Sequence, residues 1–324
     1  MLDLPTVLLA DELLDKAFGR AAKATIAKGP DRATRQKNLA ATRVQIAGHT
    51  LESSLRAYVK GFPSLDRLPP FYRELVDILV DSGKLKKHLG AVDWASGTCA
   101  DLTRSAVRRI GKEAARHSLR LRKEAFGRLA SVVGQIAGDL EGLVAARTAL
   151  RRLPVVDPDI PTIVVAGYPN VGKSAFVRAA SSGRPKIADY PFTTKRVSIG
   201  HFERGARRYQ VLDTPGLLDR PMEARNRIER QAVNALAHLA DVVLFILDPT
   251  GTAGYPLEDQ LRLLDSVRAT FPDTPVVVVA TKADLAGEET PYPQMSSVTG
   301  DGVQVALDLA LAAVTSRAPA SGPR

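Results

Sequence analysis

A glycine-rich loop with one lysine and one serine has the spacing that binds nucleotide phosphates. Residues 167–174 match the pattern G-x-x-x-x-G-K-[ST], between an apolar run at 162–166 and a helix-like run at 175–180. Glycine lets the backbone wrap around phosphate oxygens, whose charge the loop N–H groups and the helix N-terminus would balance. We expect Lys173 to reach the β- and γ-phosphates and the Ser174 hydroxyl to bind Mg²⁺. The residues predicted to surround the phosphates are Pro169, Asn170, Val171, Gly172, Lys173, Ser174 and Ala175.

A second motif, Thr281-Lys282-Ala283-Asp284, follows an apolar run at 275–280 and indicates which base is bound. The Asp284 carboxylate can accept hydrogen bonds from the N1–H and the exocyclic amine of guanine, whereas adenine would leave it unpaired. The usual pattern is Asn-Lys-x-Asp, and Thr281 removes an amide that would brace the phosphate loop. We therefore expect GTP and GDP as ligands. The predicted contacts to the base come from Thr281, Lys282, Asp284, Ser296, Ser297 and Val298, the last three after a final short strand.

An Asp-x-x-Gly motif at 213–216 and two threonines before it are expected to sense the γ-phosphate. Asp213 should hold Mg²⁺ through water, and the Gly216 N–H should contact the γ-phosphate. A loop that ends in Thr193 and Thr194 could complete the Mg²⁺ shell when GTP is bound. Thr194 is preferred as the Mg²⁺ ligand, but the spacing leaves both threonines open.

The position that orients the attacking water in many GTPases holds Leu217 in this chain. An apolar side chain cannot position water, so we expect slow hydrolysis, on the order of 10⁻⁴ to 10⁻² s⁻¹ without assistance. The Asn170 carbonyl oxygen could help to hold a K⁺ ion against the charge of the transition state, or Asn170 could only cap or brace the loop. Both alternatives stay open. The expected catalytic residues are Lys173, Thr194, Gly216 and Asn170.

These motifs follow β-branched runs that alternate with helical segments in the second half of the chain. The runs lie at 162–166, 196–202, 208–213, 241–247 and 275–280. The second and third runs are close enough to form an antiparallel hairpin. Such alternation is typical of a mostly parallel sheet with helices on both faces, the α/β fold of P-loop GTPases. We expect this domain over 162–316, followed by a flexible tail at 317–324.

The first half of the chain has a helical pattern instead. Apolar residues recur at spacings of three and four from residue 7 to 152, which predicts an α-helical bundle. Helices are expected near 8–26, 32–60, 70–82 and 98–122, and the apolar series from Phe126 to Leu143 predicts one further long helix. A proline-rich linker at 153–161 should separate this helical domain, residues 1–152, from the α/β domain.

Positive charge is concentrated in the helical half. The net charge is +10, and residues 1–160 hold 27 Lys and Arg against 18 Asp and Glu, whereas residues 161–324 hold 18 against 17. Such asymmetry indicates a polyanionic partner, which could be RNA, DNA or an acidic surface. On one continuous helix, basic residues at four-residue spacing would form a ridge that follows phosphates; an ordinary solvated helix face is the alternative. The ridge residues are Arg104, Arg108, Lys112, Arg116 and Arg120, with Lys123 nearby, and a second basic stretch comprises Lys23, Lys28, Arg32, Arg35 and Lys37.

Other features bear on the compartment. The single cysteine, Cys99, excludes an intrachain disulfide and favours a reducing environment. The longest apolar runs, such as 242–247, are far shorter than the ~20 residues of a membrane helix. The first residues carry no basic region ahead of an apolar patch, so we expect no signal peptide. The prediction is a cytoplasmic protein, monomeric when free, with no membrane partner.

Four segments, at 167–174, 190–195, 213–221 and 225–232, carry a family resemblance that extends upstream through 69–75. They resemble the nucleolar GTP-binding protein 1 family of Obg-related GTPases over nearly the whole chain. The resemblance implies a GTPase that acts in assembly of the large ribosomal subunit, with its helical N-terminal domain on ribosomal RNA. The chain looks like the short archaeal form, because eukaryotic members carry a long C-terminal extension.

Functions of other classes stay open at this point. One is a GTP-dependent regulator of a protein partner or of an anionic membrane surface, unrelated to ribosomes. No amphipathic membrane anchor stands out in the sequence, which disfavours the lipid version. An RNA-modifying GTPase is disfavoured because no second catalytic constellation is present. Co-sedimentation with ribosomal particles in the presence of a GTP analogue and of GDP would distinguish a role in ribosome assembly from regulation of another protein partner.

Overall fold

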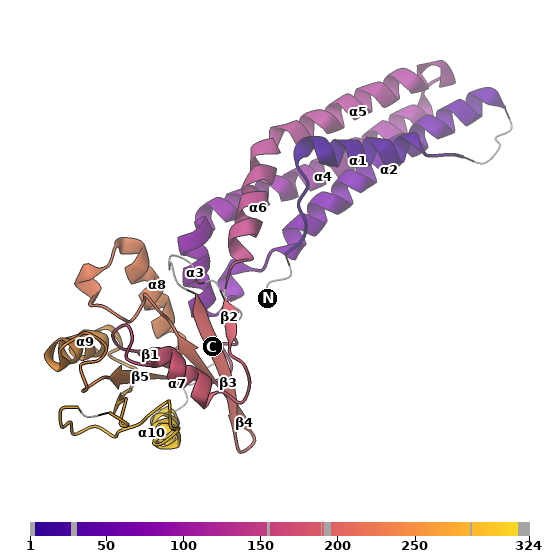
Figure 1. Ribbon diagram of the computed structural model, residues 1–324. Coiled ribbons are helices and arrows are strands. Elements are labelled where there is room, and N and C mark those ends of the chain that lie inside the picture. The colour runs from indigo at the N-terminus through magenta and orange to yellow at the C-terminus, as the bar shows by residue number, and fades with distance from the viewer. Residues whose placement is uncertain are drawn as a thin grey trace. The chain divides into compact units, whose positions relative to one another are not determined.

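The computed structural model describes residues 4–26, 31–153, 156–188, 190, 196–285 and 287–316. The chain divides into two compact units, both drawn in Figure 1. The helical unit comprises the described residues of 2–65 and 80–151. The sheet unit comprises residues 66–79 together with the described residues from 152 onward.

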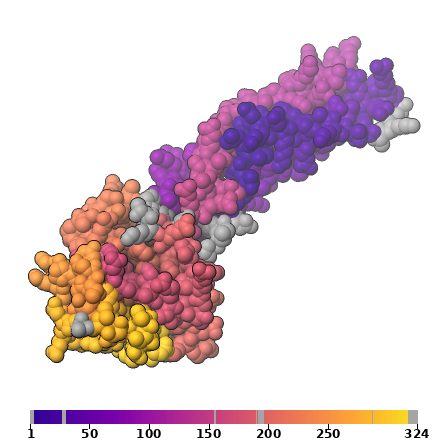
Figure 2. Space-filling model, viewed as in Figure 1, coloured from indigo at the N-terminus to yellow at the C-terminus, as the bar shows by residue number. Residues whose placement is uncertain are grey.

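Two long helices form the centre of the helical unit. They are α2 (Arg32–Gly61) and α4 (Ser82–Lys112), which pack along one another. α1 (Ala10–Ala22) packs on α2, while α5 (Ser118–Gln135) and α6 (Ala137–Leu150) pack on α4. Figure 2 shows the indigo surface of α1 beside the magenta surface of the last two helices. Asp31 caps the N-terminus of α2, where its side chain accepts a hydrogen bond from the Thr34 N–H (2.7 Å). The predicted helical bundle is confirmed.

Two helices predicted to be continuous are broken. α4 ends at Lys112 because Glu113 and Ala114 are extended (ψ 162° and 145°), and a 3₁₀ turn, Ala115–His117, leads into α5. The prediction of one helix over 98–122 is therefore wrong. The apolar series predicted as one helix is divided at Ile136, between α5 and α6. No single helix in the described ranges is long and apolar enough to cross a membrane, and only the bent pair of Ala115–Gln135 with Ala137–Leu150 (49°) meets that criterion, by length and composition.

The sheet unit contains a six-stranded sheet in the order β2-β3-β4-β1-β5-β6. β1 is parallel to β4 and β5, and β5 is parallel to β6, whereas β3 is antiparallel to β2 and β4. The hairpin predicted from two close β-branched runs is confirmed, and the short edge strand β2 was not predicted. The strands are β1 (Thr162–Ala166), β2 (Lys186–Ala188), β3 (Val197–Arg204), β4 (Arg207–Asp213), β5 (Val242–Leu247) and β6 (Val276–Ala280).

Every residue of β1 and β5 is buried, which indicates that helices cover both faces of this sheet. One apolar layer joins Ile163 and Leu244 of the strands to Phe176 of one helix and Leu307 of another. These two helices, α7 and α10, also contact each other. The predicted α/β architecture is confirmed. Its helices are α7 (Lys173–Ala180), α8 (Arg227–Ala237), α9 (Leu257–Thr270) and α10 (Val303–Ser316).

One helix of the N-terminal half belongs to the sheet unit. This helix, α3 (Pro70–Val80), lies in sequence between two helices of the other unit. The Tyr72 hydroxyl donates to the Val156 carbonyl (2.5 Å) and accepts from the Val156 N–H (3.0 Å), which anchors the proline-rich segment. Glu74 Oε1 lies 2.9 Å from His238 Nε2 at the end of α8. The predicted domain 1–152 includes α3, whose contacts to Val156 and His238 are with residues of the sheet unit.

Candidate nucleotide site and basic surface

The glycine-rich loop joins β1 to α7 at the carboxyl edge of the sheet. Gly167 (φ 135°), Asn170 (φ 63°) and Gly172 (φ 101°) have positive φ. A side chain at Gly167 would clash, since its Cβ would lie 2.5 Å from the Ile246 carbonyl oxygen. Asparagine adopts positive φ more readily than most residues, so the loop gives Asn170 a backbone role. The loop borders a cavity of about 430 Å³ lined by Pro169, Asn170, Gly172, Lys173, Ser174, Ala175, Pro215 and Asp219.

Lys173 and Ser174 begin α7 in the wall of this cavity. Lys173 Nζ donates to the carbonyl oxygens of Gly167 (2.8 Å) and Tyr168 (2.6 Å), which holds the ammonium over the loop. The Ser174 hydroxyl donates to the carboxylate of Asp213, which is buried at the end of β4. The two oxygen ligands predicted for Mg²⁺ therefore meet, although they are 39 residues apart in sequence. A hydroxyl beside a carboxylate suits the hard Mg²⁺ ion.

The Asp-x-x-Gly motif leads from β4 into a turn around Gly216. The Gly216 N–H donates to the Asp219 carboxylate (2.9 Å), and its carbonyl accepts from Arg225 Nη1 (3.0 Å). Both side chains are buried, and neither was assigned a role from the sequence. Leu217, in the position of the water-orienting glutamine, is fully buried.

Thr193 and Thr194, predicted to complete the Mg²⁺ shell, lie outside the described residues. Tyr190, shortly before them, is buried, and its hydroxyl donates to the Ala232 carbonyl of α8 (3.1 Å). Its ring centroid lies 6.5 Å from that of Phe71 in α3. Burial raises the pKa of the Tyr190 hydroxyl far above its ordinary value, so it remains a protonated donor. Tyr190 thus ties the chain just before the two threonines to α3 and α8.

The segments predicted to bind the base meet beside the phosphate loop. Thr281 is buried directly after β6, and its hydroxyl oxygen lies 3.4 Å from where a Cβ on Gly172 would be. The Ala283 N–H donates to the Met295 carbonyl (3.1 Å), which brings residues 281–284 next to residues 296–298. Asp284 is exposed at this edge of the sheet.

Ser296, Ser297 and Val298 form a turn held by its own hydroxyl group. The Ser296 hydroxyl accepts from the Val298 N–H at 3.2 Å. The Ser297 hydroxyl is buried and has no hydrogen-bond partner among the described residues. The turn follows a single isolated bridge between Ala280 and Gln294, where a final short strand was predicted.

Asp248, directly after β5, braces the segment predicted to bind the base, and this role of Asp248 was not predicted. Its fully buried carboxylate accepts from Lys282 Nζ (2.7 Å), the Ala253 N–H (2.7 Å) and the Thr250 hydroxyl (2.6 Å). Burial by itself would raise the pKa of Asp248, but these hydrogen bonds outweigh it and hold the pKa below its ordinary value. Lys282 has positive φ (59°), an uncommon conformation that this contact helps to maintain. The available signal was its position at the end of a buried strand.

The six residues predicted to bind RNA are all exposed, but they do not lie on one helix. The predicted continuous ridge is wrong, because the chain reverses direction between α4 and α5. The residues lie instead around the end of this helical hairpin. Arg104, Arg108 and Lys112 are on α4, Arg116 is in the 3₁₀ turn, and Arg120 and Lys123 are on α5.

Three residues of the second basic stretch come to the same end of the bundle, whereas Lys23 follows the last turn of α1. Arg32, Arg35 and Lys37 lie in the first turns of α2, and Lys28 lies outside the described residues. Figure 1 shows the start of α2 and the α4–α5 turn at one end of the bundle. The apolar cluster at this end joins Ala40 and Val44 of α2 to Ile110, Leu121 and Ala125 of the other two helices. We call Arg32, Arg35, Lys37, Arg108, Lys112, Arg116, Arg120 and Lys123 the basic end.

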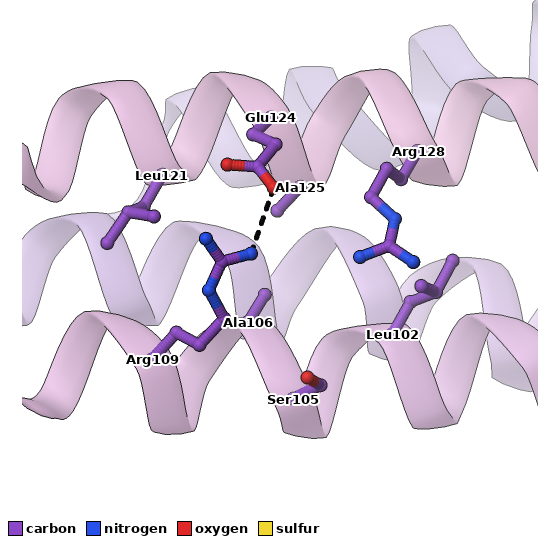
Figure 3. A pocket seen from close by; sticks show the side chains of 8 residues that line it. All are labelled: Leu102, Ser105, Ala106, Arg109, Leu121, Glu124, Ala125 and Arg128. Atoms are coloured by element: carbon purple, nitrogen blue, oxygen red, sulfur yellow. Dashed lines mark hydrogen bonds and ion pairs between the residues drawn. The ribbon is translucent and has the colours of Figure 1, made fainter.

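An ion pair crosses the hairpin beside the basic end. Arg109 Nη1 of α4 lies 2.9 Å from Glu124 Oε1 of α5. Figure 3 shows the side chain of Arg128, also of α5, pointing toward α4. The hydrogen bond from Arg109 is the main cause that lowers the pKa of Glu124. Arg108 and Lys112 form no ion pair among the described residues, so their charge is available to an external anion.

Comparison with known proteins agrees with a helical region followed by a nucleotide-binding fold. The model of the NOG1 N-terminal helical domain matches residues 2–157, and the model of nucleolar GTP-binding protein 1 (NOG1) matches residues 227–284. Nucleolar GTP-binding protein 1 of Saccharomyces cerevisiae is 34% identical over 290 residues, which are 89% of this chain and 45% of the yeast protein. The chain belongs to the nucleolar GTP-binding protein 1 family.

An archaeal protein is similar over more of its own length. The uncharacterized protein MJ1408 of Methanocaldococcus jannaschii is 37% identical over 296 residues, which are 88% of this chain and 81% of that protein. A solved structure of a nucleolar GTP-binding protein 1 from Plasmodium falciparum is 32% identical, with a TM-score of 0.45, and covers 51% of this chain and 91% of that chain. The chain spans less than half the length of the yeast relative.

Membership of the nucleolar GTP-binding protein 1 family bears on α3. The NOG1 N-terminal helical model includes α3 and continues to residue 157, through Val156, which Tyr72 holds. In this member of the family, a helix of the N-terminal region therefore packs in the sheet unit.

Proposed function

We propose that this member of the family binds GTP and GDP at the carboxyl edge of its sheet. The observation that carries the proposal is convergence at that edge. The phosphate loop follows β1, Asp213 ends β4, and residues 281–284 follow β6. Ligands of parallel α/β sheets bind outside the carboxyl ends of the strands. The curated relatives carry the words GTP-binding in their name, which supports the same ligand.

The residues of this edge fit a guanine nucleotide with Mg²⁺. Loop N–H groups and the N-terminus of α7 would bind the phosphates, and Lys173 would exchange a loop carbonyl for a phosphate oxygen. Ser174 and Asp213 would hold Mg²⁺, which supplies positive charge against the phosphate oxygens. Asp284 would accept the two donors of guanine. The partnerless Ser297 hydroxyl is a polar group that a ligand could satisfy.

Hydrolysis of GTP is expected to be slow in this member. The buried Leu217 cannot orient water, and either Thr194 or Thr193 would complete the Mg²⁺ shell. Asn170 lines the cavity from a left-handed conformation, and a role toward K⁺ remains part of the proposal. Turnover assays in K⁺ and in Na⁺ test that part, and equal rates would remove it.

A base-exchange variant tests the nucleotide assignment. Asp284→Asn presents one acceptor and one donor, which match the N1–H and the carbonyl of xanthine instead of the two donors of guanine. We expect GDP affinity to fall by roughly 100-fold and xanthosine diphosphate to bind instead. Asp273→Asn, at another exposed carboxylate, serves as the control. Equal binding of ATP and GTP by the unmodified protein would overturn the proposal.

We further propose that the protein acts as a GTP-dependent switch in assembly of the large ribosomal subunit, through binding of ribosomal RNA by the basic end. The relatives' name refers to the nucleolus, where eukaryotic ribosomes are assembled. The basic end gathers cations from three helices and a turn, all exposed except the half-buried Lys37, which suits phosphate contacts that follow shape and charge without reading bases.

Paired charge reversals on α4 test this surface. Arg108→Glu with Lys112→Glu changes the basic end, and Lys86→Glu with Lys87→Glu changes two exposed cations near the other end of the same helix. We expect only the first pair to weaken binding to precursor ribosomal RNA and to reduce the salt slope by about 2. A similar loss with both pairs, or with neither, would contradict a site at the basic end.

Nucleotide state would change docking by reordering the segments near 185–196 and 214–230. α3 is suited to transmit this change, because Phe71 contacts Tyr190 and Glu74 pairs with His238 at the end of α8. α3 is followed after one residue, Asp81, by α4. Co-sedimentation with precursor particles should therefore differ between a GTP analogue and GDP. Equal co-sedimentation would remove the switch.

A cytoplasmic protein that is monomeric when free belongs to the same proposal. The single cysteine, Cys99, is buried and forms no disulfide, which suits a reducing compartment. Cell fractionation and light scattering of the purified chain test the two statements separately.

A further inference from the structure

Asp219 places a carboxylate in the wall of the cavity proposed for the phosphates. The side chain is 9% exposed and lines the cavity together with Lys173, Ser174 and Pro215. Its Oδ2 accepts a hydrogen bond from the Gly216 N–H at 2.9 Å. An anion at this point repels a bound triphosphate, so its presence calls for a reason.

The same N–H is the group expected to contact the γ-phosphate. A single N–H makes one strong hydrogen bond, so a bond to Asp219 and a bond to the γ-phosphate compete. Both acceptors are anions, so their mutual repulsion at short range adds to this competition. GDP has no γ-phosphate and leaves the bond between Asp219 and Gly216 undisturbed.

We propose that Asp219 sets the preference between GTP and GDP, because GTP has to displace its carboxylate from the Gly216 N–H and GDP does not. The inference rests on the proposed binding of guanine nucleotides. It makes Asp219 a specificity-determining residue that acts on the triphosphate, whereas Asp284 acts on the base.

Arg225 offers the displaced carboxylate a second partner. This buried guanidinium donates to the Gly216 carbonyl (3.0 Å) and to the Arg220 carbonyl (2.5 Å). Its Nε–H is buried and has no hydrogen-bond partner among the described residues. Burial lowers the pKa of Arg225, and the negative charge of Asp219 acts against this shift. We therefore expect a carboxylate that leaves Gly216 to move toward this cationic donor of the same segment.

A purely structural role makes a different prediction. The Leu217 N–H donates to the Thr214 carbonyl (3.0 Å), so residues 214–217 form a turn that Asp219 also caps. If Asp219 served only to hold this turn, its loss would weaken GDP and GTP analogues by the same factor. Competition predicts instead a change in the ratio of the two affinities.

The test compares two nucleotides in two variants of the full chain. Asp219→Asn and Asp219→Ala are titrated by calorimetry with Mg·GDP and with the Mg²⁺ complex of a non-hydrolysable GTP analogue. We expect the ratio of GTP-analogue affinity to GDP affinity to rise roughly tenfold, the effect of one hydrogen bond to a charged group. Glu223→Gln neutralises an exposed carboxylate of the same segment and should leave the ratio unchanged. Thermal unfolding confirms that each variant is folded.

The outcomes separate this inference from the proposed function. Two results would overturn the role of Asp219: an unchanged affinity ratio in both folded variants, or an equal fall in the affinities for both nucleotides. Neither result would affect the proposal that the unmodified protein binds guanine nucleotides. The role of Asp219 is likewise overturned if Glu223→Gln raises the ratio as much. Failure of the unmodified protein to bind either nucleotide would overturn the proposed function, and the inference with it.

Discussion

Asp248 provides the sharpest test of how residues 281–284, the segment proposed to bind the base, are held. Asp248→Asn keeps the volume of the side chain but removes its negative charge. The carboxylate is fully buried and accepts from Lys282 Nζ, the Ala253 N–H and the Thr250 hydroxyl, all within 2.7 Å. The Thr250 N–H also donates to this carboxylate, at the oxygen that Lys282 and Ala253 do not use (3.0 Å). An amide accepts at one atom only, so in either orientation its NH₂ group faces an N–H donor that cannot accept.

The size of the effect follows from burial. Removal of one partner of a fully buried ion pair costs about 3–5 kcal/mol, because the remaining charge is stranded. The Lys282 side chain is 22% exposed, so its ammonium can regain water, and we take a lower value of about 2 kcal/mol. If this energy is what holds residues 281–284 ready for the base, GDP affinity should fall roughly 30-fold.

Titration with a fluorescent GDP measures this loss, with Asp265→Asn at an exposed carboxylate as the control. The lowered pKa of Asp248 sets the pH dependence. A depressed folded-state pKa contributes stability above the unfolded value of 3.8 and loses it as pH falls through the folded value. The difference in the free energy of unfolding between the variant and the unmodified protein should therefore be constant from about pH 5 to 8. GDP affinity unchanged in a folded Asp248→Asn protein would refute the reasoning.

Three further predictions concern packing. Gly48→Ala should destabilise the helical unit by about 1–3 kcal/mol, because the added Cβ would lie 1.8 Å from the buried Thr103 hydroxyl. Gly127→Ala, in open space on α5, should instead stabilise it by up to ~1 kcal/mol. Hydrogen exchange in α2 and α5 measures both effects. Cys99 should resist thiol reagents at pH 8 until the chain unfolds, since burial raises its pKa to about 12, and reaction at the rate of a free thiol would contradict this. Tyr190→Phe should lower the melting temperature by removing about 1 kcal/mol, because the Ala232 carbonyl loses its donor; an unchanged melting temperature would show that this hydrogen bond contributes little.

Periodicity in the sequence predicted the elements whose signals are local. The helix expected at 32–60 is α2, Arg32–Gly61, and the expected hairpin is the β3–β4 pair. The breaks at Glu113 and Ile136 were missed, because a three-and-four spacing of apolar residues can continue through a short break in a helix. The edge strand β2 was missed because it is only three residues long and mostly exposed, so it has no apolar alternation.

The site shows the same division between local and distant signals. The phosphate loop and the Asp-x-x-Gly segment are contiguous patterns, so their chemistry could be predicted from residue types. Asp248 and Arg225 act through partners up to 34 residues away, and a lone Asp or Arg carries no pattern. Asp219 lies within segment 213–221, which carries the family resemblance, but only its hydrogen bond to Gly216 indicates a role.

The sequence by itself determined the family of the protein and predicted its ligand, because the phosphate and guanine recognition that we propose needs a few residue types at short, regular spacings. It also determined that the positive charge lies in the first half of the chain. Only the tertiary structure decided that α3 packs in the sheet unit, that two distant basic stretches share one end of a bundle, and that Asp219 meets Gly216 in the cavity wall. These are contacts between segments that are brought together by packing of apolar faces, and the spacing of residues along a chain does not record which faces meet.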